Sequence, residues 1–510
     1  MHRILGEKLL QLFKPKEWTG NYRADLLAGI LVALALIPEA ISFSIIAGVD
    51  PKVGLYASFV IAVTTAIFGG RPGMISAATA ATALLMYPLV SSVTESGGNG
   101  LQYLLAASIL AGILQLFWAA IKLANQLKFV SRAVMIGFVN ALAILIFTAQ
   151  LPELSLEQPN SLTIYAMVAA ALAIIYLLPR LTTVIPSPLV AIIVITLFAV
   201  FSNSGVPTVG DRGELPSTFP SFGIPQVPFT FETLEIIFPY AIAISLVGLL
   251  ESFLTANVVD DLTDTPSNKN KEASAQGIAN FLSGLFGGMA GCAMIGQSVI
   301  NIKSGGRTRL STLSAGVFLL LFMLFLGTQV EKIPMAVLVA IMIMVSIGTF
   351  NWSSLRQIRK IPRSETAVML TTVFMTVFSH NLAVGVLSGV ALNALLFSRK
   401  IAQLVFVDSV IDPQGEKRTY NVGGQIFFVS VNEFLDAFDF KEDVEFVNID
   451  LTHAHLWDQS AIAALDKVVI NFRRNGAEVR VVGLNEASAT LVDKLAIHDK
   501  SDSLEDLASH

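Results

Sequence analysis

Long apolar runs follow one another along the chain as far as Lys400. A helix needs about 20 apolar residues to cross the hydrocarbon core of a bilayer, and most of these runs are close to that length. We expect spans near residues 24–47, 52–68, 101–121, 129–149, 162–178 and 187–203 and, after a Pro- and Gly-rich connector at 203–230, near 233–256, 272–288, 310–327, 332–349, 364–379 and 381–398.

Two shorter, glycine-led segments interrupt this pattern, one in each half. Residues 69–82 read GGRPGMISAATAAT, and residues 287–311 begin GGMAGCAMIGQS, so both have a Gly-Gly pair, two residues and a third glycine. Short interrupted segments at corresponding places in two halves point to a transporter's central binding site. The alternative is that the small residues only permit close helix packing.

Each glycine-led segment is predicted to be a short extended piece followed by a half-helix. The free N–H groups at a helix start carry positive partial charge, so two such starts facing each other would hold an anion without a buried arginine. Further hydrogen bonds would come from Thr79, Thr82, Gln297 and Ser298.

With these two segments each half has seven, and an odd number per half means that the halves insert in opposite orientations as an inverted repeat. Basic residues concentrate in alternate loops, which the positive-inside rule places in the cytoplasm. They are Lys122, Lys128, Arg132, Arg180, Lys269, Lys271, Lys303, Arg307, Arg309, Arg356, Arg359, Lys360, Arg363, Arg399 and Lys400.

The pattern divides the chain into three parts. Residues 1–23 are predicted to be a cytoplasmic segment, in which the stretch 1–18, with apolar residues at positions 4, 5, 9, 12 and 13, forms either an amphipathic helix on the membrane surface or a solvated leader. Residues 24–400 form a polytopic α-helical transmembrane domain of fourteen segments, with halves at about 24–203 and 233–400. Residues 401–510 alternate short apolar runs with helical patterns, which is typical of a small α/β domain, and they follow a predicted inside loop.

Composition supports a membrane protein and argues against most enzymes. The chain of 510 residues is 54% hydrophobic and 14% charged, with a net charge of −5. A single cysteine, Cys292, excludes an intramolecular disulfide and a Cys-based zinc site. Six histidines lack metal-ligand spacing, and neither a Ser-His-Asp arrangement nor a Walker loop is found. We therefore expect no enzymatic activity, no cofactor or metal, no nucleic-acid partner and no cleavable signal peptide.

Two carboxylates fall inside predicted spans. Glu39 lies in the first span and Glu251 in the eighth, where Thr255 follows one turn later on the same face. A carboxyl group in mid-membrane is costly and usually serves an ion or proton path. The alternative is a glutamate that reaches the membrane interface. Aspartates at 260, 261 and 264 are predicted to form a solvated face in the following loop.

Four stretches resemble one known family. They are Pro-Glu-Ala of the first span, where most members have Pro-Gln, LLESFLTA of the eighth span, and GLFGGMAG followed by NIKSGGRTRLS. These are similar to the SulP anion permeases, or solute carrier family 26, and FVNIDLTHAHLWDQSAIAAL resembles the strand, turn and helix of a STAS domain. The resemblance implies a core (segments 1–4 and 8–11) and a gate (5–7 and 12–14), an elevator-like mechanism and usually a homodimer.

The same resemblance implies site residues. The substrate pocket of the family corresponds to Ala77, Ala78, Thr79, Ala293, Met294 and Ile295. The acidic and hydroxyl positions of sodium-coupled bicarbonate members correspond to Glu251 and Thr255. This chain has Gln297 where many members have arginine, and Met294 and Ile295 replace small or hydroxyl residues. Glu39 in place of glutamine favours protons as the coupling ion.

Our hypothesis from the sequence is a proton-coupled symporter of a small anion, such as sulfate, bicarbonate or a dicarboxylate, in a bacterial inner membrane. The alternatives are a sodium-coupled bicarbonate symporter and an uncoupled anion channel or voltage-responsive protein. In the C-terminal domain, Ser460 occupies the Asp-x-Ser position that is phosphorylated in some bacterial STAS proteins. We favour a helix-capping role for this serine.

Overall fold

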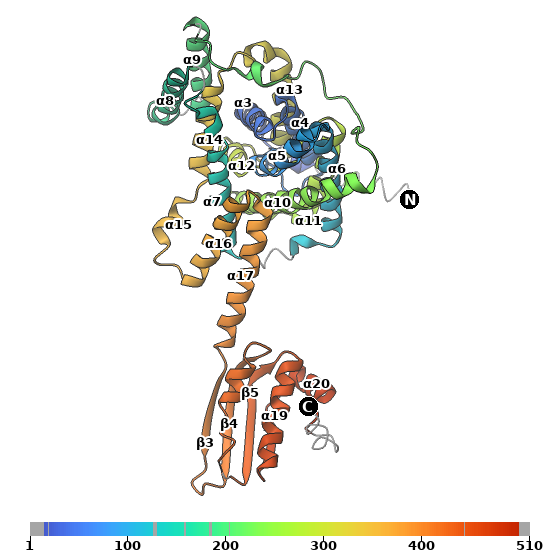
Figure 1. The fold of residues 1–510 in the computed structure, drawn as a ribbon, viewed down its shortest axis with the longest axis vertical. Helices are drawn as coiled ribbons and strands as arrows, with labels where there is room; N and C mark the ends of the chain where they lie inside the picture. The colour runs from blue at the N-terminus through green and yellow to red at the C-terminus, as the bar shows by residue number, and fades with distance from the viewer. Residues whose placement is uncertain are drawn as a thin grey trace. The chain divides into compact units, whose positions relative to one another are not determined.

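The computed structural model describes residues 15–18, 20–125, 130–157, 160–182, 186–202, 204–442 and 444–498. The chain divides into two compact units, Met1–Val390 and Ala391–His510 (Figure 1). Of the stretch 1–18, in which an amphipathic helix is predicted, positions 1–14 lie outside the described residues, and the described part is a single helical turn, α2 (Pro15–Trp18).

Helices dominate the first unit, and a short strand interrupts each half. The elements of the first half are α3 (Tyr22–Ile46), α4 (Pro51–Phe68), β1 (Ser76–Ala78), α5 (Ala80–Glu95), α6 (Gly100–Ala120), α7 (Arg132–Thr148), η2 (Leu151–Leu154), α8 (Ser161–Leu177), η3 (Leu178–Arg180) and α9 (Ser187–Ser202). The connector carries η4 (Val209–Arg212).

The second half repeats this order. Its elements are α10 (Phe231–Thr263), α11 (Lys269–Leu285), β2 (Gly291–Ala293), α12 (Ile295–Lys303), α13 (Arg309–Val330), α14 (Met335–Thr349), α15 (Trp352–Gln357), α16 (Arg363–Ser379) and α17 (Leu382–Ala402). Every predicted segment coincides with a helix or a strand-helix unit. Within the described residues nine helices are long and apolar enough to cross a membrane, so the count of fourteen crossings stays a prediction.

Packing in the first unit has the symmetry expected of an inverted repeat. Helices α3, α4, α6, α7 and α8 of the first half correspond to α10, α11, α13, α14 and α16 of the second. Three contacts therefore recur as equivalent pairs. The contact α3–α13 corresponds to α10–α6, α4–α13 corresponds to α11–α6, and α7–α16 corresponds to α14–α8. Glycine makes the closest of these approaches possible. A Cβ on Gly112 of α6 would lie 2.5 Å from the backbone nitrogen of Phe281 in α11, so only a residue without a side chain fits there.

The second unit is an α/β domain, as predicted. Its sheet has the order β3 (Phe406–Ile411), β4 (Lys417–Ile426), β5 (Phe446–Leu456) and β6 (Glu478–Val482), in which β3 is antiparallel to β4 and the other neighbours are parallel. The helices are α18 (Val431–Asp436), α19 (Gln459–Arg474) and α20 (Glu486–Leu495), and α19 lies alongside the sheet in Figure 1. Buried apolar residues of α19, including Ile462, Leu465 and Val469, explain this position, because they form one face of the helix.

The capping role predicted for Ser460 is wrong. Asp458 is the N-cap of α19, and its carboxylate accepts a hydrogen bond of 2.9 Å from the backbone nitrogen of Ala461. Ser460 lies in the first turn of the helix and is exposed to solvent. Asp458 takes the cap because a carboxylate is favoured beside the positive end of a helix.

Candidate functional site

The two glycine-led segments meet at the centre of the first unit. Strands β1 and β2 are antiparallel, with Ala77 opposite Cys292 at the middle of the three-residue register. All six strand residues are buried, and helices α5 and α12 begin directly after the strands. The crossing therefore brings together the six predicted pocket residues, namely Ala77, Ala78, Thr79, Ala293, Met294 and Ile295.

The starts of the two helices differ in their caps. Thr79 is the N-cap of α5, and its side chain accepts a hydrogen bond from the backbone nitrogen of Thr82. Met294 holds the same place at α12 and offers no side-chain hydrogen bond. The first N–H groups of α12 are thus left without a capping side chain, which is the arrangement that favours an anion.

A chain of polar side chains links the crossing to α10. The Cys292 sulfur lies 2.9 Å from Oε2 of Glu251 and 3.1 Å from Oγ1 of Thr79, which is in turn 3.1 Å from Oγ1 of Thr82. The chain joins α10, β2 and the first turn of α5 through contacts in the interior of the protein. Sequence reasoning used Cys292 only to exclude disulfides and zinc, because nothing local indicated which side chains it would face.

Two hydroxyl groups of α10 hold the backbone of β2. Ser252 Oγ accepts a hydrogen bond of 3.1 Å from the nitrogen of Ala293. Thr255 Oγ1 lies 2.8 Å from the carbonyl oxygen of Glu251 and 3.4 Å from that of Ala293. The Thr255 hydroxyl is therefore directed at backbone carbonyls, although Thr255 and Glu251 share one face of α10 as predicted.

The other predicted carboxylate meets the second half-helix. Glu39 of α3 is 8% exposed, and its carboxyl faces the side chain of Gln297, in the first turn of α12. The next residue, Ser298, accepts a hydrogen bond of 2.9 Å from the nitrogen of Ile75, just before β1. Ser298 thus joins the two segments to each other, whereas Gln297 connects α12 to Glu39.

One face of the first turn of α12 is open. Gly296 is exposed, and a Cβ built on it would have no atom within 4 Å. The strand residues beside it, such as Ala77 and Cys292, have no exposed surface. The first turn of α12 is therefore open at Gly296, and the strand residues are enclosed.

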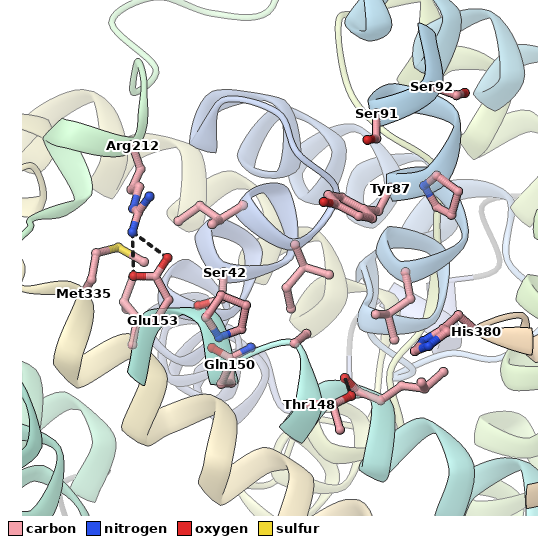
Figure 2. A pocket seen from close by; sticks show the side chains of 18 of the residues that line it. Ser42, Tyr87, Ser91, Ser92, Thr148, Gln150, Glu153, Arg212, Met335 and His380 are labelled. Carbon is pink, nitrogen blue, oxygen red and sulfur yellow. Dashed lines mark hydrogen bonds and ion pairs between the residues drawn. The ribbon is translucent and has the colours of Figure 1, made fainter. Parts of the chain in front are cut away.

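A cavity of about 820 Å³ lies next to this region (Figure 2). Residues of α3 and α5 line one part of it, and residues of α7, α14 and the α16–α17 turn line another, so it separates the predicted core from the predicted gate. Figure 2 shows Arg212 bound to Glu153, with a nitrogen–oxygen distance of 2.5 Å, on one side and His380 on the other. Ser42, one turn beyond Glu39 in α3, lines the cavity, but the strand residues do not.

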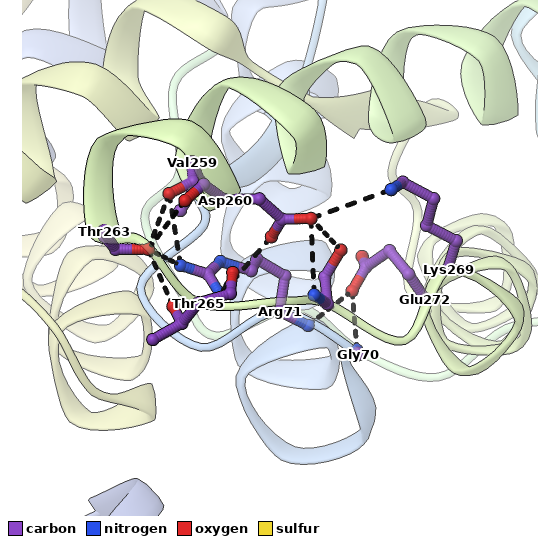
Figure 3. A network of polar contacts seen from close by, with 9 residues as sticks. Gly70, Arg71, Val259, Asp260, Thr263, Thr265, Lys269 and Glu272 are labelled. Atoms are coloured by element: carbon purple, nitrogen blue, oxygen red, sulfur yellow. Dashed lines mark hydrogen bonds and ion pairs between the residues drawn. The ribbon is translucent and has the colours of Figure 1, made fainter.

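The linker before β1 is held by a buried ionic network (Figure 3). The Arg71 guanidinium donates to the carbonyl oxygens of Val259 and Thr265, at 3.2 and 3.0 Å, and lies 3.4 Å from the Asp260 carboxylate. Glu272 Oε2 accepts hydrogen bonds from the backbone nitrogens of Gly70 and Arg71. The expectation that the aspartates form a solvated loop face is wrong for Asp260, because α10 extends to Thr263 and places Asp260 beside Arg71.

Comparison with known proteins places this architecture in a family. Residues 22–372 match the model of the sulfate permease family, and residues 410–508 match that of the STAS domain. A relative in Bacillus subtilis (strain 168), named "Putative sulfate transporter YbaR", is 57% identical over 481 residues, which cover 94% of this chain and 98% of the relative. The "Bicarbonate transporter BicA" of Picosynechococcus sp. is 30% identical over 410 residues, covering 75% of this chain and 71% of that protein.

Solved structures agree with these matches. The transmembrane domain of a cyanobacterium bicarbonate transporter BicA has a TM-score of 0.65 at 26% identity, and the comparison covers 71% of this chain and 97% of that one. The murine Solute Carrier 26 family member A9 anion transporter, in the inward-facing state, has a TM-score of 0.79, with coverages of 98% and 94%. At 16% identity the latter shows likeness of fold alone.

These matches confirm the resemblance seen in the sequence. The described elements also agree with it, since a helical unit with two crossing half-helices precedes a four-stranded α/β domain. The chain therefore belongs to the sulfate permease family, whose members are multi-pass membrane transporters of anions such as sulfate and bicarbonate rather than enzymes, and it carries a STAS domain.

Proposed function

We propose that this protein is a secondary active transporter that moves a small anion together with a proton across a bacterial inner membrane. The anion is a sulfate, a bicarbonate or a dicarboxylate, held between the starts of α5 and α12. The N-terminus and the STAS domain are on the cytoplasmic side, and the protein works as a homodimer. One observation carries the proposal: the Glu39 carboxyl, 8% exposed, faces the side chain of Gln297, in the first turn of the uncapped half-helix α12.

The charge balance at this point favours protons. Gln297 is neutral, so an anion at the start of α12 has helix N–H groups to bind but no cation from this turn. An ionised Glu39 next to it would repel the anion, and the repulsion is strong where water is scarce. A protonated Glu39 removes that repulsion. Because binding free energies are reciprocal, an anion that prefers protonated Glu39 also raises the affinity for the proton.

Transport requires access from both sides. We propose that the core, formed by α3–α6 and α10–α13, moves relative to the gate in an elevator-like step. The cavity between α3 and α5 on one side and α7 and α14 on the other supports this division, since it follows the boundary between the two groups of helices. Moving the core along that boundary would carry the crossing, with Glu39 and Gln297, as one body.

Uptake into proteoliposomes tests the role of Glu39. With an inward-directed proton gradient, the wild-type protein is expected to accumulate labelled sulfate, bicarbonate or succinate above the equilibrium level. Glu39→Gln is expected to lose gradient-driven accumulation and to keep downhill exchange, because the amide cannot take up a proton. Glu331→Gln, at the exposed C-terminal end of α13, is the matched control, and its anion uptake should be driven by the proton gradient as in the wild type. Gradient-driven uptake by Glu39→Gln would refute the assignment.

Sodium-coupled bicarbonate transport is the second candidate. The 30% identity to the bicarbonate transporter BicA favours bicarbonate as the anion, and Glu251 and Thr255 correspond by family resemblance to the acidic and hydroxyl positions of sodium-coupled members. Two contacts argue against it. A sodium ion prefers a shell of oxygen ligands, as other hard cations do, whereas Glu251 binds a thiol and the Thr255 hydroxyl is directed at backbone carbonyls. Replacing sodium with choline in the same vesicles separates the two: proton coupling predicts unchanged uptake, and sodium coupling predicts its loss.

A further inference from the structure

We propose that Cys292 is a positioning residue that transmits the protonation state of Glu251 to Thr79 at the start of α5. This inference deepens the proposed function, because it rests on the anion site between α5 and α12. It adds a residue and a route that the sequence did not indicate.

The geometry provides a continuous path between the two ends. The sulfur is 2.9 Å from Oε2 of Glu251 and 3.1 Å from Oγ1 of Thr79, and both distances are within hydrogen-bond range for sulfur. Cys292 has no exposed surface, and Thr79 is 3% exposed. No water is needed to complete the path, because the thiol contacts both partners directly.

With Glu251 ionised, the hydrogen bonds of the path run in one direction. A carboxylate only accepts, so the thiol S–H donates to Oε2. The sulfur then accepts from the Thr79 hydroxyl, while the Thr82 hydroxyl donates to the Thr79 carbonyl oxygen at 3.0 Å. In this state the Thr79 hydroxyl hydrogen is turned toward Cys292 and away from a ligand at the start of α5.

A proton taken up from solvent at Glu251 Oε2 reverses the direction. The carboxylic acid O–H donates to the sulfur, and the thiol S–H turns to donate to Oγ1 of Thr79. The Thr79 hydroxyl hydrogen is then free to bond a bound anion. No covalent bond to sulfur changes, since each hydroxyl or thiol hydrogen only rotates. Protonation of Glu251 thus adds a donor to the anion site, and anion binding favours protonation by the same factor.

Other titratable groups on the elements packed against α10 have their own partners or face elsewhere. The described residues of α6 include no charged side chain, and Glu272 of α11 binds the Gly70 and Arg71 backbone. On α5, Glu95 accepts a hydrogen bond from Ser91 at 2.7 Å. Lys303 of α12 is exposed at the far end of that helix. Glu251 therefore acts on the path through Cys292.

A small apolar residue that only fills space is the competing explanation, because buried free cysteine often behaves in that way. Cys292 is closely surrounded here, since it has no exposed surface. The two explanations predict opposite rankings of variants. If the thiol only fills space, Cys292→Ala is tolerated at least as well as Cys292→Ser. If it transmits hydrogen bonds, serine substitutes and alanine does not.

The infrared S–H stretching band tests the path without a substrate. Cys292 is the only cysteine, so the band of the purified full-length protein belongs to this thiol alone. In the wild type the band should move to higher frequency as the pH falls, because the S–H exchanges a carboxylate acceptor for a weaker hydroxyl acceptor. In Glu251→Gln it should be independent of pH, and in Glu331→Gln it should follow the wild type. A pH-independent wild-type band, or an unchanged response in Glu251→Gln, overturns the proposal.

Anion binding provides the second readout. Thermal stabilisation by sodium sulfate and by sodium bicarbonate is measured at two pH values, since binding to the folded state raises the unfolding temperature. Cys292→Ala should make the half-saturating anion concentration the same at both pH values and, at the higher pH, about tenfold lower than in the wild type, because the Thr79 hydroxyl then has no sulfur acceptor to compete with the anion. Cys292→Ser should restore the wild-type pH profile. An alanine variant with that profile overturns the proposal.

Combining variants separates this inference from the proposed function. In the Glu251→Gln background, Cys292→Ala should cause little further change in anion binding, because the group it connects no longer titrates. If Cys292→Ala changed the half-saturating anion concentration equally in the wild-type and Glu251→Gln backgrounds, Cys292 would act independently of Glu251. Proton-coupled uptake through Glu39 is measured separately with Glu39→Gln, so either assignment can fail while the other stands.

Discussion

The two strand-helix segments that cross at the centre share a glycine spacing but are built differently. The linker of the first, residues 69–75, is held by charged side chains, because Arg71 binds the end of α10 and Glu272 binds the linker backbone. The linker of the second, residues 286–290, is held by neutral groups. Ser283 donates to the Met289 carbonyl at 2.7 Å, and Asn280 bonds both backbone groups of Gly291.

The third glycines of the two motifs, Gly73 and Gly291, are required for different structural reasons. Gly73 lies in a turn with φ of +76°, a conformation that glycine adopts at little cost. Gly291 lies inside β2, where a Cβ would be 2.0 Å from the carbonyl oxygen of Ala77. The matching spacing therefore indicated the correct two segments, although its third positions are not equivalent in the fold.

The N-termini of α5 and α12 also differ. Thr79 caps α5 with its own hydroxyl, whereas α12 has no side-chain cap and an open position at Gly296. From this contrast we propose that the first segment is the anchored half and that the second is the half that receives a ligand. Three substitutions test this contrast, from the largest expected effect to the smallest.

Gly291→Ala should be the most damaging. The added methyl group cannot coexist with the Ala77 carbonyl, so the two strands must separate and the starts of both helices must move. We expect a loss of stability of about 3 kcal/mol or more, as for other overpacked or strained core positions. Thermal unfolding of the purified protein measures it, with Gly223→Ala as a control at an exposed position where a Cβ would have no atom within 4 Å. A variant as stable as wild type would show that the crossing is not tightly packed.

Arg71→Met should cost about 3 kcal/mol, because it removes the guanidinium that the Asp260 carboxylate and the Thr265 carbonyl oxygen contact in the protein interior, and Lys269, 3.7 Å from the Asp260 carboxylate, replaces only part of that interaction. The Arg71 side chain is 5% exposed, so water cannot replace it. Arg71→Lys should recover only part of the loss, since an ammonium group cannot reproduce the several directed contacts of a guanidinium. Thermal unfolding again provides the measurement. Full recovery with lysine would mean that only charge matters at the first linker.

Gly296→Val should affect ligand binding and leave stability close to wild type. Open space in front of Gly296 accommodates the side chain, but the methyl groups would obstruct approach to the first N–H groups of α12. We expect the half-saturating concentration of sulfate or bicarbonate to rise about tenfold, or about 1.4 kcal/mol. Thr94→Val, near the far end of α5, is the control. If Gly296→Val bound sulfate and bicarbonate as well as the wild type, the start of α12 would not be where the anion binds.

Much of the site was predictable at the level of segments. Gly-rich sequence in two short runs predicted broken helices, and Glu39 and Glu251 drew attention because a carboxyl group inside an apolar run is costly. Individual contacts were less predictable. Gln297 was expected to face a ligand, and its side chain faces Glu39, whereas the Ser298 hydroxyl, expected in the same role, accepts a hydrogen bond from the backbone nitrogen of Ile75. Both residues have side chains suited to either task, so residue type alone could not decide.

By itself the sequence determined the order of the helices, the two short interruptions and the separate α/β domain, because each follows from local runs of apolar, small and alternating residues. Only the tertiary structure decided which distant groups meet. Cys292 is 41 residues from Glu251 and 213 residues from Thr79, and Arg71 is 188 residues from Val259. Contacts over such separations arise when helices pack at glycine-lined surfaces, and no local pattern in the sequence records which side chains that packing will place together.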